Sequence, residues 1–148
     1  MSEEAILALL ARCRAIMAQW SGGFEDVDTG EQVLTQLMNL LHPNHSLCVQ
    51  MKTKLVSSYD LVKNKTMEQI DRQMVLVEQV LEVMEVIDPG LTPRRGTLLK
   101  HLVDVRMQKA NLDVKEGNID KKTHLELMRS SMVLMKEVMK CCRYSLAL

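Results

Sequence analysis

Two histidines and a cysteine fall three residues apart, at His42, His45 and Cys48. Imidazole and thiolate groups at this spacing can share a helix face and bind zinc. Pro43, however, interrupts the backbone between the two histidines, and no fourth ligand stands nearby. We therefore expect loop and capping roles for residues 42–44, a half-buried Cys48, and no bound metal or cofactor.

Cys141 and Cys142 are adjacent and form a second candidate site, for redox chemistry. Neighbouring cysteines form only strained disulfides. Cys142 also continues an apolar stripe, which predicts that Cys142 lies in the core and that Cys141 is the exposed thiol. A reactive thiol needs a base or a cation beside it, and no histidine lies within one turn of this pair. We expect no catalytic residue here.

Arg95, Arg106 and Lys109 form the candidate partner-binding site. At about 100° per residue, Arg106 and Lys109 lie within the apolar stripe of their predicted helix, beside Leu102. Long cationic side chains can snorkel along the edge of such a stripe. The alternative is a concave groove in which the three cations bind the carboxylates of an acidic peptide.

Arg95 also has a structural interpretation. It follows a turn that Pro89, Gly90 and Pro93 make rigid, and Gly96 would let another backbone approach closely. A cation at a helix N-terminus is unfavourable because it opposes the helix macrodipole. We therefore expect a nearby carboxylate to form an ion pair with Arg95 and stabilise this turn. The carboxylates just before the turn are those of Glu82, Glu85 and Asp88.

Composition limits the classes of protein to consider. The chain has 148 residues with 19 basic and 19 acidic side chains, which suits one domain over residues 1–148. A nucleic-acid binder would need a basic excess, and no apolar run approaches the roughly 18 residues of a membrane span. The start, Met1–Glu4, is acidic and unlike a signal peptide. Four cysteines without framework spacing indicate reduced thiols and a cytoplasmic or nuclear location.

Apolar residues step by three and four through six segments, and aromatic residues make up only 3% of the chain. This pattern predicts an all-α fold of about six antiparallel amphipathic helices, stacked as degenerate tetratricopeptide-like pairs. The first helix should run from about Glu3 to Trp20 and the fifth from Pro93 to about Lys115. The expected starts of the others are capping boxes at Thr29 with Gln32 and Thr66 with Gln69, and caps at Asn44, Thr92 and Asp120.

The sixth predicted helix has the cleanest apolar stripe. Its members are Leu125, Met128, Met132, Met135, Met139 and Cys142. A stripe at this spacing is most often core, and we expect it to pack inward. Two alternatives remain open: this face docks on another domain, or it drives self-assembly into a helical bundle.

Several motifs occur in an order that belongs to a known family. Leu41-His42-Pro43-Asn44-His45 opens one helix, Ile87-Asp88-Pro89-Gly90-Leu91 and Arg95-Gly96-Thr97-Leu98-Leu99 flank a turn, and Gly117-Asn118-Ile119 precedes the last helix. Over residues 41–143 this order resembles the C-terminal helical domain of the SET and MYND domain-containing (SMYD) protein-lysine methyltransferases. Residues 1–40 match that family more weakly.

The resemblance implies a tetratricopeptide-like domain that packs behind a catalytic SET domain and offers a surface to partners such as chaperone tails. The chain lacks the Cys-x-x-Cys pairs of the family's zinc finger. Asn44-His45-Ser46 resembles the triplet of the family's cofactor site, but it leads into Leu47-Cys48-Val49 where the family has Cys and then Pro-Asn. We therefore expect no enzymatic activity and no S-adenosylmethionine site.

The sequence favours a non-catalytic interaction or scaffold module. Its expected partner is a protein or an acidic peptide, including a chaperone tail, or a SET domain supplied in trans; nucleic acid and membrane are not expected. The alternative is a fragment or isoform of a lysine methyltransferase whose SET domain lies outside this chain. The oligomeric state does not follow from the sequence.

Overall fold

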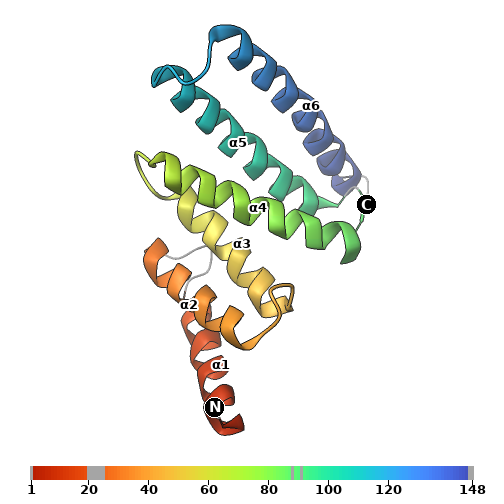
Figure 1. Ribbon diagram of the computed structural model, residues 1–148. Helices are drawn as coiled ribbons and strands as arrows, with labels where there is room; N and C mark the ends of the chain where they lie inside the picture. Colours follow the sequence, from red (N-terminus) through yellow and green to blue (C-terminus); the bar gives the residue numbers. More distant parts are fainter. Residues whose placement is uncertain (1, 20–25, 88, 91, 147–148) are drawn as a thin grey trace. The chain divides into compact units, whose positions relative to one another are not determined.

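The computed structural model describes residues 2–19, 26–87, 89–90 and 92–146, with side chains described as far as residue 141. Six helices account for most of these residues, and no strand occurs among them, which confirms the predicted all-α fold (Figure 1). The chain divides into two compact units, Met1–Lys63 and Asn64–Leu148, and each is described by itself. The single domain expected over residues 1–148 stays a prediction.

The first unit contains α1 (Glu3–Ala18), α2 (Val27–Leu40) and α3 (Ser46–Asp60), and each helix packs on the next along the chain. The hydroxyl of Tyr59 on α3 donates to Oε1 of Glu31 on α2 at 2.7 Å. The buried apolar residues of α2 and α3 include Val33, Leu34, Leu37, Leu55 and Val56.

The start of α2 differs from the prediction. The carboxylate of Asp26 accepts the N–H of Asp28 at 3.0 Å and the hydroxyl of Thr29 at 3.1 Å. Asp26 is therefore the N-cap, and the predicted capping box at Thr29 is wrong. The physical reason is competition: an aspartate three residues earlier offers the orphan N–H groups a stronger acceptor, and the helix begins there. Trp20, which was predicted to end the first helix, lies outside the described residues.

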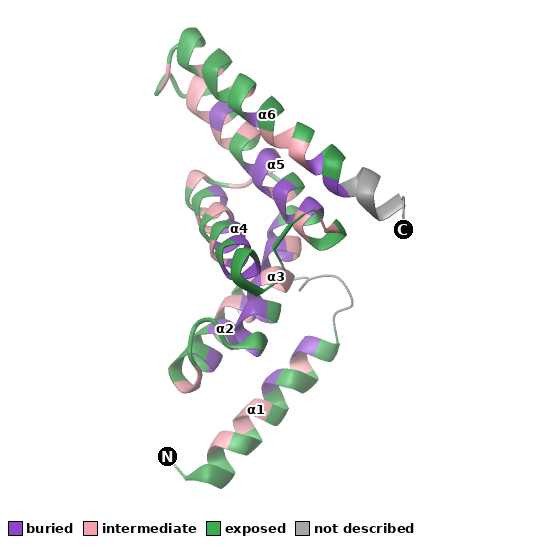
Figure 2. Ribbon diagram, turned by 90° about the vertical axis from the view of Figure 1, so that its right-hand side faces the viewer, coloured by how far each residue is buried: buried purple, intermediate pink, exposed green. Residues whose placement is uncertain are grey.

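The second unit contains α4 (Met67–Ile87), α5 (Pro93–Lys115) and α6 (Lys121–Leu146), and α5 packs on both of the others. Buried residues line α4 and α5, including Leu76, Val77, Val80, Leu98, Leu102 and Val105. These two helices therefore supply most of the core of the unit, whereas α6 is largely exposed along its length (Figure 2).

All three helix starts predicted in this unit are confirmed. The N–H of Thr66 donates to Oε1 of Gln69 at 3.0 Å, and the N–H of Gln69 donates to Oγ1 of Thr66 at 3.3 Å, which completes the capping box. The side chains of Thr92 and Asp120 accept the N–H three residues on, at 3.2 and 2.8 Å. Gly117, with φ of 75°, follows the end of α5, as a left-handed glycine should.

Candidate functional site

The stripe predicted to pack inward on α6 lies on its outer face. Leu125, Met132 and Met139 are 56%, 65% and 52% exposed, although they repeat every seven residues like core positions. Met128 and Met135, between them, are half-buried. The prediction that this stripe is core is therefore wrong for Leu125, Met132 and Met139, whereas Met128 and Met135 are partly covered. The side chain of Cys142 lies outside the described residues.

The inner face of α6 consists of smaller residues. Val138 is 7% exposed and Cys141 is fully buried, so the prediction that Cys141 is the exposed thiol is also wrong. A Cβ added to Gly96 on α5 would lie 2.8 Å from Cβ of Cys141. This contact confirms that Gly96 permits a close approach of α5 to α6 at Cys141. The small side chains of this contact face α5, and the larger stripe therefore faces away from it.

A row of cations runs along one edge of the outer stripe. Lys122, Arg129 and Lys136 are exposed and also repeat every seven residues, about 40–60° around the helix from Leu125 and Met132. None of the three makes an ion pair or hydrogen bond with another described residue. We call these three residues the basic row, and Leu125, Met128, Met132, Met135 and Met139 the outer stripe.

Of the cations predicted to bind a partner, Arg95 connects three helices. Its guanidinium lies 4.0 Å from the carboxylate of Glu85 on α4 and 3.9 Å from that of Glu137 on α6. The side chain is 20% exposed, and its buried Nε has no hydrogen-bond partner among the residues that the structure describes. These distances are at the limit of an ion pair, so Arg95 interacts only weakly with the two carboxylates. Glu85 is one of the three carboxylates that the sequence predicted as its partners.

Lys109 has a closer partner. Its Nζ lies 2.9 Å from Oδ1 of Asp71 on α4, and this hydrogen bond raises the pKa of Lys109. Arg106 is exposed and makes no ion pair with a described residue. Arg95 and Lys109 stand about 21 Å apart along α5 at 1.5 Å per residue, so the three cations do not converge on one point. An acidic peptide would have to displace carboxylates from two of them.

The two histidines of this segment cap turns, which was expected for His42 and not for His45. Nδ1 of His42 accepts the N–H of Asn44 at 3.1 Å, and Nδ1 of His45 accepts the N–H of Leu47 at 3.2 Å. His45 is the N-cap of α3, so the prediction that Asn44 is the cap is wrong; an imidazole nitrogen takes the place of the amide oxygen. No cluster of metal-binding side chains occurs in the described part of the chain.

The thiols at Cys13 and Cys48 are buried within the helices. Burial raises the pKa of both, and the opposing effects of Arg12 on Cys13 and of Lys52 on Cys48 are smaller. Cys48 is fully buried and not half-buried as predicted. A thiol with a raised pKa carries little thiolate at neutral pH and is a poor nucleophile.

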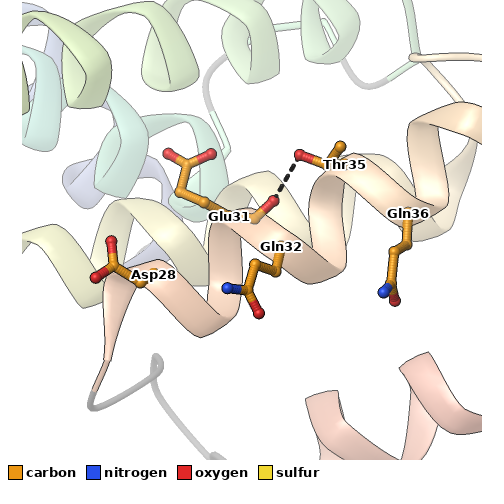
Figure 3. Close-up of a pocket in the computed structure, with 5 residues that line it drawn as sticks. All are labelled: Asp28, Glu31, Gln32, Thr35 and Gln36. Carbon is orange, nitrogen blue, oxygen red and sulfur yellow. Dashed lines mark hydrogen bonds between the residues drawn. The ribbon is translucent and has the colours of Figure 1, made fainter.

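A pocket of about 550 Å³ lies along α2 in the first unit (Figure 3). The residues that line it are Asp28, Glu31, Gln32, Thr35 and Gln36. The Thr35 hydroxyl donates to the carbonyl of Glu31 within α2 at 2.9 Å, and the Glu31 carboxylate accepts from Tyr59, so Glu31 already serves the packing of α2 and α3. Among the described residues, no metal-binding set lines this pocket.

No protein-family model, no curated protein and no solved structure matches this chain. The resemblance to the SMYD C-terminal domain therefore stays a hypothesis that depends on the motifs quoted above. No helix in the described part of the chain has the length and apolarity of a membrane span.

Proposed function

We propose that this chain is a non-catalytic protein–protein interaction module that docks a partner segment on the outer face of α6. The observation that supports the proposal is the exposure of three large apolar side chains, Leu125, Met132 and Met139, along one line of the helix. The half-buried Met128 and Met135 lie between them on the same side of the helix. Large exposed apolar patches mark interaction sites. Flexible thioethers are also suited to packing against a partner's side chains.

The dimensions of the outer stripe fit a helical segment. From Leu125 to Met139 the stripe extends about 21 Å along α6, which is four turns. A partner helix with apolar residues at the same heptad spacing could place them between these side chains. Because α6 already packs on α5 through its inner face, the outer face can be covered without unfolding the second unit.

The resemblance to the SMYD family is compatible with this function. It implies that a SET domain supplied in trans, or a longer chain that contains one, is a class of partner to test. The cations Arg95, Arg106 and Lys109 along α5 remain a second proposed contact for an acidic peptide. Arg106 is the residue to reverse there, since a glutamate at position 95 would stand beside Glu85 and Glu137 and disturb the corner.

The test uses a fluorescently labelled helical peptide of about three heptads, with Leu at the apolar positions and Gln along both flanks. We expect saturable binding by fluorescence polarisation. The triple variant Leu125→Gln, Met132→Gln, Met139→Gln should lose it while keeping its helical circular dichroism, because all three side chains are exposed.

A matched control replaces three exposed apolar residues elsewhere: Leu7→Gln, Leu61→Gln and Val75→Gln. This control should bind the peptide as the unaltered protein does. Equal loss in both triple variants, or no binding of helical peptides with any flanking charge, would contradict the proposed function.

A further inference from the structure

The two edges of the outer stripe differ in charge and in accessibility. One edge is the basic row, whose three cations are exposed and have no ion-pair or hydrogen-bond partner among the described residues. The other edge turns toward α5, where Ser131 and Val138 are buried. Any segment that covers the stripe therefore meets cations on one side and the α5 contact on the other.

We infer that the segment docked by α6 is an acidic amphipathic helix of another protein, whose carboxylates face Lys122, Arg129 and Lys136. This inference rests on the proposed function and adds the chemistry of the partner to it. The heptad repeat of both the stripe and the basic row selects a helix, because the side chains of an extended strand repeat every second residue.

A second copy of this chain does not fit the same surface. In an antiparallel pair of α6 helices, edges of the same kind face each other, so the two basic rows would meet and repel. In a parallel pair, each basic row would face the edge at which Ser131 and Val138 are already covered. An acidic helix avoids the repulsion, because its carboxylates pair with the basic row while an uncharged flank faces the covered edge, and opposite charges along one flank also fix its register.

An anionic membrane is a different occupant that a basic, apolar helix face could attract. The outer stripe contains no aromatic ring, whereas helices that lie in the membrane interface commonly carry them. This observation favours a protein helix over a lipid surface.

The experiment compares three labelled peptides that share the same Leu positions and differ only in the flanking residues, which are Glu, Gln or Lys. We expect the Glu peptide to bind about tenfold more tightly than the Lys peptide at low salt, given the usual strength of exposed ion pairs. Added salt should reduce this difference. The Gln peptide should lie between them.

A charge-reversal variant makes the test specific to the basic row. Lys122→Glu, Arg129→Glu, Lys136→Glu should invert the preference, so that the Lys peptide binds more tightly than the Glu peptide. The control reverses three exposed cations of the first unit, Arg12→Glu, Arg14→Glu and Lys63→Glu, and changes the net charge equally. It should keep the original preference.

The outcomes separate the inference from the proposed function. Equal binding of all three peptides would overturn the inference while leaving the docking function intact, whereas no binding of any peptide would overturn both. A dimer of the unaltered protein in light scattering that the variant Leu125→Gln, Met132→Gln, Met139→Gln loses would assign the surface to a second copy. Co-sedimentation with phosphatidylserine vesicles, without preference for the Glu peptide, would assign it to a membrane.

Discussion

The inner and outer faces of α6 belong to one helix, yet they have opposite roles. The inner face is buried, and near its C-terminal end the small residues Val138 and Cys141 are seated against Gly96. The outer face is larger, more apolar by composition and open to solvent, with Met132 65% exposed. The comparison shows that the more hydrophobic stripe of a helix is not always the one that packs, because a close approach between helices is possible only through small side chains.

The strongest way to break this arrangement is to enlarge Gly96. In Gly96→Val, the new Cβ would lie 2.8 Å from Cβ of Cys141, and neither atom can move without its backbone. We expect a loss of about 3 kcal/mol in the free energy of unfolding, at the upper end for overpacking. Urea denaturation followed by circular dichroism measures it.

A double-mutant cycle identifies the cause of that loss. Gly96→Ala should cost less in a Cys141→Gly background than alone, because the clashing atom is gone. The same cost in both backgrounds would mean that the helices do not meet at these residues.

Truncation on the two faces should sharpen the contrast between them. Val138→Ala removes buried methyl groups from the inner face and should cost about 1–2 kcal/mol, whereas Met132→Ala on the outer face should change stability by less than about 0.5 kcal/mol. Thermal unfolding of both variants tests this difference. Equal costs would mean that both faces of α6 are covered in the isolated chain.

A smaller effect is expected where Arg95 approaches the flank of α6. Arg95→Met keeps the apolar stem, removes the unpartnered Nε and breaks only two long ion pairs. We expect its free energy of unfolding to lie within about 1 kcal/mol of that of the unaltered protein. A much larger loss in urea denaturation would show that the guanidinium holds the three helices together.

The smallest effect on stability is expected at the N-terminus of α6, where Asp120 caps the helix. Hydrogen bonds from the hydroxyl and the N–H of Thr123 lower the pKa of Asp120. A carboxylate whose folded pKa is lowered stabilises the fold above its unfolded pKa, about 4, and this contribution is lost as pH falls through the folded value. The destabilisation caused by Asp120→Ala should therefore be present at pH 7 and shrink below about pH 4.

Comparing the melting temperatures of the two proteins between pH 2 and pH 7 measures this dependence. A difference that does not change with pH would mean that the carboxylate is not the capping group.

The sequence predicts the local features of this fold better than its packing. Thr66 with Gln69, Thr92 and Asp120 form caps as predicted, because a cap depends on residues within one turn. Two caps were predicted at the wrong residue: Asp26 caps α2 in place of Thr29, and His45 caps α3 in place of Asn44. In both cases several side chains close in sequence could accept the free N–H groups, and the residue at which the backbone turns helical determines which one does.

The candidate site illustrates what periodicity leaves out. The repeat of Leu125, Met132 and Met139 is visible in the sequence, but its orientation depends on Gly96, which is some 30–40 positions away. The repeat of Lys122, Arg129 and Lys136 could have indicated that this side of the helix is exposed. Cations at every seventh residue beside an apolar stripe are typical of a helix edge that solvent reaches. The pairing of Lys109 with Asp71 depends on how α4 and α5 pack, which no local pattern encodes.

The outer stripe also makes α6 sensitive to oxidants. Thioethers as exposed as those of Met132 and Met139 are open to peroxide, which converts them to sulfoxides that are polar and chiral. The buried contact of Gly96, Val138 and Cys141 contains no methionine. Mild oxidation should therefore make the outer surface hydrophilic while the helix stays folded on α5, and methionine sulfoxide reductases could reverse the change.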